Sequence, residues 1–368
     1  MSFGPAIVTG GCGFTGAHMV DRLLAHDQKC QVHVVTRNVR NQVPGVTYHS
    51  CDISSSGEVQ GVFEKVRPRI VFHMATPDST ISQPTMFQKV NVDGARNLLL
   101  AAKRVGTVHA FIYTSSSSVI HNDKTGAVNL DESMPVLGRD AQTMMYSLTK
   151  GEAEREILAA NRATGEDTML TVSIRPPMIF GERDFVCAGR MIENARQGRA
   201  HYQFGSGKNL TDVVYISNLI DALILAAEAL LRAYGNAPPP PETRVDGESF
   251  LILNEKPVPF WAFQRSLVAS AGYLVKEEEI RTIPLWLAFV VAAISELVTW
   301  VLSLGKKNSI ISRHTVRAST IERTFNGEKA RRVLGYKPKV SIEEGVARTG
   351  RWFQEQEIKR SAEAKKII

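Results

Sequence analysis

The feature that most constrains this chain is a glycine-rich turn between a short apolar run and a helical pattern. Ala6-Ile7-Val8 is apolar throughout, as expected of a parallel strand that is covered on both faces. Thr9–Gly16 follows as Thr-Gly-Gly-Cys-Gly-Phe-Thr-Gly, and His18–Ala25 then repeats apolar residues at helical spacing. Strand, glycine turn and helix in this order predict an α/β fold whose first turn holds a dinucleotide pyrophosphate at a helix N-terminus.

Each glycine of this turn has its own expected role. Gly10 permits the tight turn, Gly13 lets the backbone approach a phosphate, and Gly16 allows the helix to pack closely against the sheet. The spacing is G-x-x-G-x-x-G, whereas the common dinucleotide fingerprint is G-x-G-x-x-G. A glycine turn that binds no ligand is the alternative, which the flanking strand and helix disfavour.

The end of the next apolar run bears on the identity of the dinucleotide. Val32–Val35 leads into Thr36-Arg37-Asn38, where a carboxylate would normally hold the adenosine ribose of NAD. No carboxylate is present there, and Arg37 offers a planar guanidinium suited to a 2′-phosphate. NADP is therefore favoured over NAD, with an ordinary solvated arginine in a loop as the alternative reading of Arg37.

A tyrosine and a lysine one helical turn apart indicate hydride chemistry. Oxidation of a secondary alcohol requires a base for its proton, and a free tyrosine, with a pKa of about 10, is a weak base at neutral pH. Tyr146 and Lys150 share a helix face, so an ammonium at Lys150 would favour the phenolate, and it could also hydrogen-bond the nicotinamide ribose. Ala110–Tyr113 is strand-like and ends in Thr114–Ser118, which supplies a hydroxyl to orient the substrate oxygen.

In this order the motifs resemble the extended short-chain dehydrogenases, specifically the branch of 3β-hydroxysteroid and sterol-4α-carboxylate 3-dehydrogenases. The resemblance extends from the first strand to about Trp352, and its motifs are Thr9–Gly16, Cys51-Asp52-Ile53, His73-Met74-Ala75, Val90–Gly94, Thr114–Val119, Tyr146–Lys150, Arg175–Gly181 and Gly327–Pro338. It implies that the catalytic residues are Ser116, Tyr146 and Lys150. Together with Arg37, which is predicted from the loop residues and not from the family, it implies a cofactor site made of Gly10, Gly13, Phe14, Gly16, Arg37, Asp52, Ile53, Ala75, Asn91, Tyr146, Lys150 and Pro176. The missing acidic residue at Thr36 departs from many members of the family.

The resemblance also implies an activity. The chain would be an oxidoreductase that transfers hydride from the 3β-hydroxyl of a sterol-like substrate, most favourably a 4α-carboxysterol, to NAD(P)+. The resulting β-keto acid would lose CO2 without a metal, because the ketone accepts the electron pair. A 3β-hydroxysteroid or triterpenoid dehydrogenase, with or without isomerase activity, is the alternative enzyme. A non-catalytic NADP sensor or scaffold is the alternative from another class, and intact Ser116, Tyr146 and Lys150 weigh against it.

The expected architecture is a doubly wound parallel sheet of the Rossmann type with a smaller C-terminal substrate lobe. A chain of 368 residues with 43% hydrophobic residues can bury a core of this size. We expect residues 1–175 to form the nucleotide-binding domain, with 212–234 returning to it. We expect 176–211 and 236–355 to form the lobe, and 356–368 to form a basic tail. The four cysteines and nine histidines show no metal-ligand spacing, so we expect no metal site. We expect the cysteines to be free thiols in a reducing compartment.

One apolar segment indicates association with a membrane. Leu285–Leu304 holds twenty residues with a single charge, Glu296, and basic residues bound it on both sides. Its length and flanks meet the requirement for a transmembrane helix. Because Gly327–Pro338 should pack on the same body as the preceding chain, we favour a helix, or a broken helical pair, buried in one leaflet over a spanning helix or a buried core helix.

The net charge of +7 is concentrated after this segment, where residues 305–368 hold 16 Lys and Arg against seven Asp and Glu. Basic residues there would attract anionic lipid headgroups, whereas no aromatic-interleaved basic motif predicts nucleic-acid binding. Lys365-Lys366-Ile367-Ile368 resembles the dilysine retrieval signal of endoplasmic-reticulum membrane proteins. We therefore expect an enzyme on the cytosolic face of that membrane. Its expected partners are a sterol and, through 285–304, membrane lipid, with a homodimer or a sterol-biosynthesis complex left open.

Overall fold

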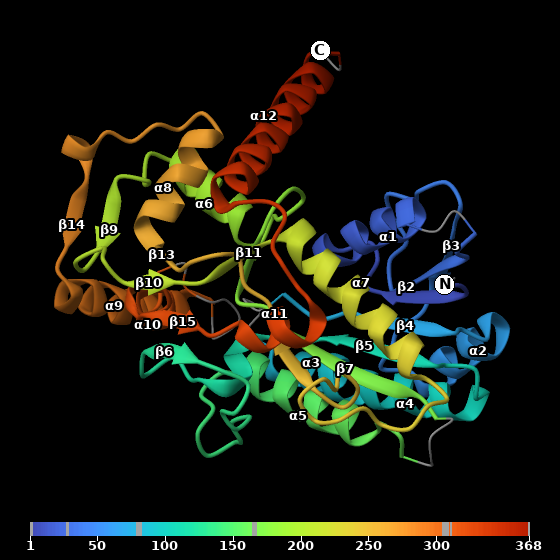
Figure 1. Cartoon of the computed structure of the whole chain (residues 1–368). Coiled ribbons are helices and arrows are strands. Elements are labelled where there is room, and N and C mark those ends of the chain that lie inside the picture. The colour runs from blue at the N-terminus through green and yellow to red at the C-terminus, as the bar shows by residue number, and fades with distance from the viewer. Residues whose placement is uncertain are drawn as a thin grey trace.

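The structure, a computed structural model, describes residues 3–26, 29–78, 83–163, 168–303, 309 and 311–366 (Figure 1). Its centre is a seven-stranded sheet in the order β12-β7-β5-β4-β1-β2-β3, in which every pair is parallel. The predicted doubly wound parallel sheet is confirmed. Its strands are β1 (Ala6–Thr9), β2 (Val32–Thr36), β3 (Val46–Ser50), β4 (Ile70–His73), β5 (Ala110–Thr114), β7 (Leu170–Arg175) and β12 (Ser249–Leu251).

Helices cover both faces of this sheet, which explains why its strands are apolar without alternation. In β1, Ala6 and Val8 pack towards α1 and α7, whereas Ile7 packs towards α2 and α4. The first face is covered by α1 (Phe14–His26), α7 (Ile216–Ala233) and α11 (Glu328–Leu334). The second is covered by α2 (Ser56–Val66), α4 (Gly94–Val105) and α5 (Met145–Ala159). Before α4 the chain forms α3 (Pro84–Phe87) and a π-helical turn, η1 (Gln88–Asp93).

The other strands form three small sheets. One has four strands in the order β13-β10-β15-β6, and the other two are the parallel pairs β11-β8 and β14-β9. These strands are β6 (Ala127–Leu130), β8 (Met178–Phe180), β9 (Tyr202–Phe204), β10 (Leu210–Thr211), β11 (Val213–Tyr215), β13 (Val258–Pro259), β14 (Arg281–Ile283) and β15 (Arg323–Phe325). The accompanying helices are α6 (Ala188–Arg196), α8 (Phe260–Ser270), η3 (Glu277–Glu279), α9 (Leu285–Ser303), α10 (Arg313–Thr320) and α12 (Ile342–Lys366).

The predicted division into a nucleotide-binding domain and a substrate lobe stays a prediction. Two strands, however, join a sheet of the other predicted part. β12 falls within 236–355, yet it pairs with β7 at the edge of the main sheet. β6 falls within 1–175, yet it pairs with β15 in the four-stranded sheet. Strands of three and four residues are too short for their sequence to indicate which sheet they join.

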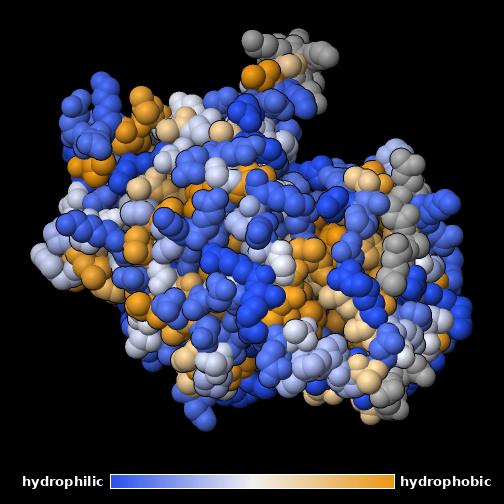
Figure 2. Space-filling model, in the orientation of Figure 1, coloured by the Kyte–Doolittle hydropathy of each residue, from blue (hydrophilic) through white to orange (hydrophobic). Residues whose placement is uncertain are grey.

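The helix α9 is unusually exposed for its composition. Among the described residues it is the one helix long and apolar enough to cross a membrane, with a mean hydropathy of 2.1, and only 11% of its apolar stretch is buried. Ala288 and Ala292 pack against Val316 of α10, while the large side chains of α9 point outward. Apolar residues reach the surface on the side of the molecule where α9 lies (Figure 2). Leu304, the last residue of the predicted segment, lies outside the described residues.

Candidate active site

Most of the predicted site residues lie at one edge of the main sheet. They follow the carboxyl ends of parallel strands, where doubly wound folds bind their ligands. Across the sheet from β3 to β7, the residues that follow the strands are Asp52 with Ile53, then Arg37, Gly10 to Gly16, Ala75, Ser116 and Pro176. The strand order reverses between β1 and β4, so the glycine turn stands at the switch point.

The geometry of the glycine turn explains why its residues lack side chains. Gly10 has a φ of 70°, and a Cβ there would lie 3.0 Å from the Cα of Ala75. A Cβ on Gly16 would lie 2.3 Å from the Gly10 carbonyl oxygen, so Gly16 lets α1 contact the turn itself. Gly13 is exposed just before Phe14, the first residue of α1, where free N–H groups and the helix dipole favour an anion.

Two further glycine contacts hold the cofactor edge together. A Cβ on Gly11, a position to which the sequence analysis gave no role, would lie 2.6 Å from the side chain of Val34 in β2. A Cβ on Gly94 would lie 2.8 Å from Ile53, which is buried against the start of α4. Asp52 accepts hydrogen bonds at 2.9 Å from both the N–H and the hydroxyl of Ser54. Ile53 is therefore a packing residue between the loop after β3 and α4, and the Asp52 carboxylate stabilises its own loop.

These residues fit a dinucleotide. The glycine turn presents N–H groups at a helix N-terminus without side chains that would block a phosphate. Arg37 is exposed after β2, and its side chain forms no ion pair with any described residue. Pro176 is buried, and its carbonyl accepts from the N–H of Ser117 at 2.9 Å, which joins the end of β7 to the turn after β5.

Lys150 is buried beneath the candidate catalytic pair. Its Nζ donates to the carbonyl of Thr114 at 2.5 Å and lies 4.2 Å from the centre of the Tyr113 ring. The side chain is nearly inaccessible, and this burial lowers the pKa of Lys150 to about 7, although the Glu154 carboxylate opposes the shift. The ammonium is therefore close to its titration midpoint at neutral pH.

Tyr146 and Ser116 face one another at the partly exposed surface above Lys150. Burial raises the pKa of Tyr146, and a hydrogen bond with the Ser116 hydroxyl opposes that rise. The sequence predicted a phenol whose pKa a lysine would lower. The structure shows the opposite direction, because desolvation, which sequence spacing does not reveal, outweighs any effect of Lys150.

Ser116 belongs to a chain of hydroxyl groups. It precedes the 3-10 turn η2 (Ser117–Ile120), and its oxygen accepts from the N–H of Ser118 at 3.2 Å. The hydroxyls of Ser116 and Ser118 lie 2.9 Å apart, and Ser147 donates to Ser118 at 2.8 Å. Because Ser147 is next to Tyr146 on α5, this chain fixes the serine turn relative to the tyrosine helix.

Asn91 lies in the π-helical turn η1 and is fully buried. Thr76 donates to its side-chain oxygen at 2.9 Å, and its side-chain N–H donates to Thr149 at 3.0 Å. Thr149 precedes Lys150, so Asn91 connects the loop after β4 to the lysine helix. This contact supports a positioning role for Asn91, and π-helical turns are frequent at functional sites.

The sequence analysis missed a buried ion pair behind the site. Arg175 contacts Glu154 at 2.5 Å, Ser173 donates to the same carboxylate at 2.7 Å, and all three side chains are buried. Glu154 lies one helical turn after Lys150, in continuation of the Tyr146–Lys150 spacing. That repeat of four residues is the signal that could have identified it.

His73, which the sequence placed in a motif without a role, stacks obliquely on Tyr113 with ring centres 5.3 Å apart. Thr9 accepts from the N–H groups of Met74 and Ala75 and therefore donates its proton to Nδ1 of His73, at 2.9 Å. Burial, with a contribution from Lys150, lowers the pKa of His73 to about 3. His73 is thus a neutral imidazole within the wall of the site.

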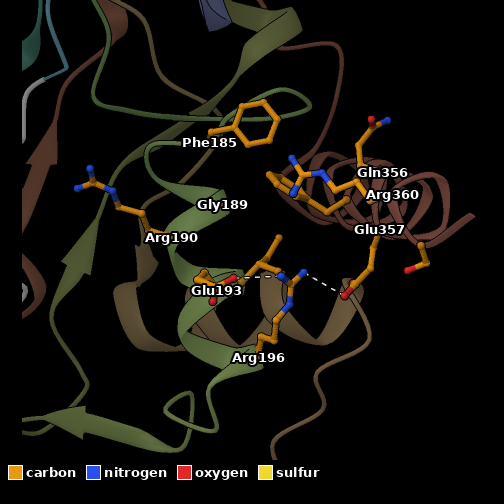
Figure 3. Close-up of a pocket in the computed structure, with 11 residues that line it drawn as sticks. Phe185, Gly189, Arg190, Glu193, Arg196, Gln356, Glu357 and Arg360 are labelled. Atoms are coloured by element: carbon orange, nitrogen blue, oxygen red, sulfur yellow. Dashed lines mark hydrogen bonds and ion pairs between the residues drawn. The ribbon is translucent and has the colours of Figure 1, made fainter. Parts of the chain in front are cut away.

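A separate hollow of about 440 Å³ lies between α6 and α12 (Figure 3). Its charged side chains largely satisfy one another, because Arg196 contacts Glu193 at 3.2 Å and Glu357 at 3.0 Å. None of the predicted site residues lines it, and we assign no ligand to it.

Comparisons with known proteins identify the family and the fold of this chain. The chain is 33% identical over 358 residues to the 3beta-hydroxysteroid-dehydrogenase/decarboxylase isoform 1 of Arabidopsis thaliana, with 93% of this chain and 78% of the relative covered. It is 30% identical to the decarboxylating sterol-4-alpha-carboxylate 3-dehydrogenase of Saccharomyces cerevisiae, with 95% and 97% covered. The fold resembles that of UDP-glucose 4-epimerase from Thermus thermophilus in complex with NAD, with a TM-score of 0.67, 21% identity, and 96% and 99% of the two chains covered. Residues 7–283 match the 3-beta hydroxysteroid dehydrogenase/isomerase family, and the chain belongs to that family.

Proposed function

We propose that this protein is a nicotinamide-dependent dehydrogenase that oxidises the 3β-hydroxyl of a 4α-carboxysterol to the ketone, with loss of CO2 at C4. The observation that carries the proposal is the pairing of Ser116 and Tyr146 above buried Lys150, beside the glycine turn. The substrate class comes from the relatives, two of which are named for 3β-hydroxysteroid or sterol-4α-carboxylate oxidation and decarboxylation.

Each side chain of the site has its own role in alcohol oxidation. Ser116 and Tyr146 hydrogen-bond the oxygen on C3, and the Tyr146 oxygen accepts its proton as the C–H bond breaks. Positive charge on Lys150 favours the phenolate of Tyr146. An oxidised nicotinamide dinucleotide, when bound, supplies the hydride acceptor.

Decarboxylation then follows from the product. Oxidation at C3 places a ketone next to the carbon that bears the carboxylate. The C4–carboxylate bond breaks, CO2 leaves, and the electron pair moves into the C3 carbonyl to give an enolate that takes up a proton. The same hydroxyls of Ser116 and Tyr146 can hydrogen-bond the enolate oxygen, which is where negative charge develops.

For the cofactor we propose NADP in preference to NAD. Arg37 is exposed and directly follows Thr36, the last residue of β2, where a carboxylate would contact the ribose of NAD. Its guanidinium, which forms no ion pair within the described part of the chain, suits a 2′-phosphate. NAD is the alternative, and the structurally similar epimerase of Thermus thermophilus was crystallised with it.

We also propose that α9 lies in one leaflet of a membrane. Its outward side chains include Trp286, Leu297 and Val301, which are 69%, 62% and 54% exposed. Glu296, its single charge, accepts two hydrogen bonds at 2.7 Å from Arg313 of α10 and is therefore turned towards protein. Small and charged side chains of α9 therefore face the protein, and large apolar side chains face outward. This arrangement is more favourable in lipid than in water.

The position of the flanking elements favours a monotopic arrangement over a spanning one. β14 ends just before α9, α10 follows it, and both contact β9 on the same body. A spanning helix would place β14 and α10 on opposite sides of a hydrocarbon layer about 30 Å thick.

An endoplasmic-reticulum location remains our prediction, because residues 367–368 and the side chains of 365 and 366 lie outside the described part of the chain.

An assay with purified protein tests the enzymatic proposal. Nicotinamide reduction is followed with a 4α-carboxysterol and with a simple 3β-hydroxysteroid, and CO2 release is measured in parallel. Tyr146→Phe should lower turnover by about 100-fold or more while cofactor binding is unchanged, because only the proton acceptor is lost. Tyr202→Phe, at an exposed position of β9, is the matched control. Full activity of Tyr146→Phe would disprove the assigned base.

The same assay distinguishes the alternative functions. Turnover of the simple steroid alone would favour the alternative 3β-hydroxysteroid or triterpenoid dehydrogenase. Cofactor binding without turnover would favour a sensor.

A further inference from the structure

The chain of hydroxyl groups that ends at Ser116 has a fixed direction. Ser147 is buried on α5, and its hydroxyl donates to the Ser118 oxygen at 2.8 Å. The proton between these two oxygens therefore belongs to Ser147, and Ser118 must donate its own proton to another group. Among the described residues, the acceptor within hydrogen-bond distance of the Ser118 hydroxyl is the Ser116 oxygen, at 2.9 Å. The hydrogen bonds therefore run from Ser147 through Ser118 to Ser116.

This chain uses both lone pairs of the Ser116 oxygen. A hydroxyl oxygen has two lone pairs and one proton. The Ser118 N–H donates to the Ser116 oxygen at 3.2 Å, and the Ser118 O–H donates to the same oxygen at 2.9 Å. Ser116 already accepts two hydrogen bonds, so it can only donate its proton to a third group. A serine outside such a chain could donate or accept, and its direction would then depend on the ligand.

A buried amide holds the two elements that carry the chain. The Gln142 side-chain N–H group donates to the carbonyls of Ser118 and His121, both at 3.0 Å. Its side-chain oxygen accepts from the N–H groups of Thr143 and Met144, at 3.0 and 3.2 Å. Both ends of the amide are therefore satisfied. The bridge fixes η2 relative to the start of α5, so the hydroxyl chain between them keeps its geometry.

Tyr146 lies at the open end of the chain. The Ser116 hydroxyl hydrogen-bonds Tyr146 and opposes the rise in the Tyr146 pKa that burial causes. A neighbouring hydroxyl lowers the pKa of a phenol by donating to the phenolate, since only the charged form is stabilised in this way. Donation from Ser116 is also the direction that the chain imposes. The Ser116 proton is therefore directed at the place where the substrate oxygen and the Tyr146 oxygen would meet.

We propose that Ser118 and Ser147 are positioning residues that make Ser116 a one-way hydrogen-bond donor to the substrate oxygen on C3. This inference rests on the proposed function. Because Ser116 cannot take a proton, the alcohol proton moves to the Tyr146 oxygen as the hydride leaves C3. When CO2 leaves, the electron pair moves onto the same substrate oxygen, to which Ser116 already donates. Hydrogen bonds in series polarise one another, so each hydroxyl of the chain strengthens this donor.

The test removes one oxygen of the chain at a time. Wild-type protein, Ser118→Ala and Ser147→Ala are assayed by nicotinamide reduction with a 4α-carboxysterol. Ser118→Ala should lower kcat by about 3- to 10-fold, the effect expected of one neutral hydrogen bond. KM should change little, because the lost interaction acts on charge that develops in the reaction. Ser147→Ala should show a smaller loss in kcat, and Ser118→Thr, which restores the hydroxyl, should recover most of the wild-type rate.

Combined variants distinguish a chain from a general loss of structure. Because Ser147 acts through Ser118, the double variant Ser118→Ala/Ser147→Ala should be no slower than Ser118→Ala. In a Ser116→Ala background, Ser118→Ala should cost no further activity. The midpoint at which kcat/KM rises with pH should move to higher pH in Ser118→Ala and return in Ser118→Thr. Ser133→Ala, on an exposed loop, is the control and should keep the wild-type rate and midpoint.

Three results would overturn the one-way chain while leaving the dehydrogenase function intact. They are a Ser118→Ala enzyme with the wild-type rate and midpoint, losses that add in the double variant, and a loss that Ser118→Thr does not recover. Wild-type protein that oxidises no sterol alcohol with either NADP or NAD would instead overturn the proposed function, and this inference with it.

Discussion

Lys150 donates from Nζ to the main-chain carbonyl of Thr114 at 2.5 Å. Thr114 ends β5 two residues before Ser116, and Lys150 lies one turn after Tyr146 on α5. A single hydrogen bond therefore joins the strand that positions the serine to the helix that positions the tyrosine. An ammonium has three donors, so this bond leaves others for a cofactor ribose.

The buried state of Lys150 predicts a pH-dependent stability. Its folded-state pKa of about 7 lies below the unfolded value of about 10.4, so the unfolded chain binds more protons between these limits. The destabilising effect of charged Lys150 is complete below about pH 7 and decreases as the pH rises towards 10.4. Lys150→Met should therefore raise Tm near pH 6, by the equivalent of about a few kcal/mol, and change it little near pH 10.

Thermal unfolding of the cofactor-free protein at these two pH values measures this effect. Lys208→Met, at an exposed position, is the control and should show no pH-dependent difference. A shift in Tm for Lys150→Met that is the same at both pH values would contradict the assigned burial.

The hydrogen bond between Ser116 and Tyr146 predicts the pH dependence of oxidation. Because the base must be deprotonated, kcat/KM should rise with pH through the Tyr146 pKa, which burial raises and Ser116 lowers. Ser116→Ala should move the midpoint of this rise to higher pH and lower the rate at neutral pH. Ser133→Ala, on an exposed loop, should leave the profile in place. A slower Ser116→Ala enzyme with an unmoved midpoint would mean that Ser116 does not tune the tyrosine.

Arg37 predicts the cofactor preference. Arg37→Asp should replace attraction for a 2′-phosphate with repulsion and offer the ribose a carboxylate, so the ratio of kcat/KM for NADP to that for NAD should fall by about 10-fold or more. Steady-state kinetics with both cofactors give this ratio. Arg104→Asp, exposed at the end of α4, controls for the change in net charge. A wild-type enzyme that already prefers NAD strongly would contradict the role of Arg37.

The exposed face of α9 predicts membrane binding that can be removed without unfolding. Val290, Leu297 and Val301 are 47%, 62% and 54% exposed, so polar residues at these positions should release a soluble and active enzyme from vesicles. Polar replacement of Ala288 and Ala292, which pack on α10, should instead destabilise the protein. Vesicle flotation and activity of the supernatant distinguish these outcomes.

Topology provides an independent check of the same proposal. In sealed microsomes, tags placed before Met1 and after Ile368 should both be digested by added protease while the membrane stays intact. Protection of one tag alone would exclude the monotopic arrangement.

The sequence by itself determined the parts of the fold that depend on local patterns. The apolar run Ala6–Val8 with its glycine turn predicted β1 and α1, and Tyr146–Lys150 lies on α5 as expected. These predictions succeed because strand burial, glycine turns and helical spacing depend on residues that are close together in the sequence. The composition of the segment likewise predicted a long apolar helix, which α9 forms, while its place in a membrane stays a prediction.

Only the tertiary structure decided which distant residues meet and how strongly each is desolvated. The sequence placed a lysine near a tyrosine, but burial sets the pKa of Lys150 near 7 and raises that of Tyr146. It gave no role to Glu154, because the buried ion pair of Glu154 with Arg175 depends on how α5 packs against β7. Desolvation and unpaired charge depend on what surrounds a side chain in three dimensions, and spacing along the chain does not record them.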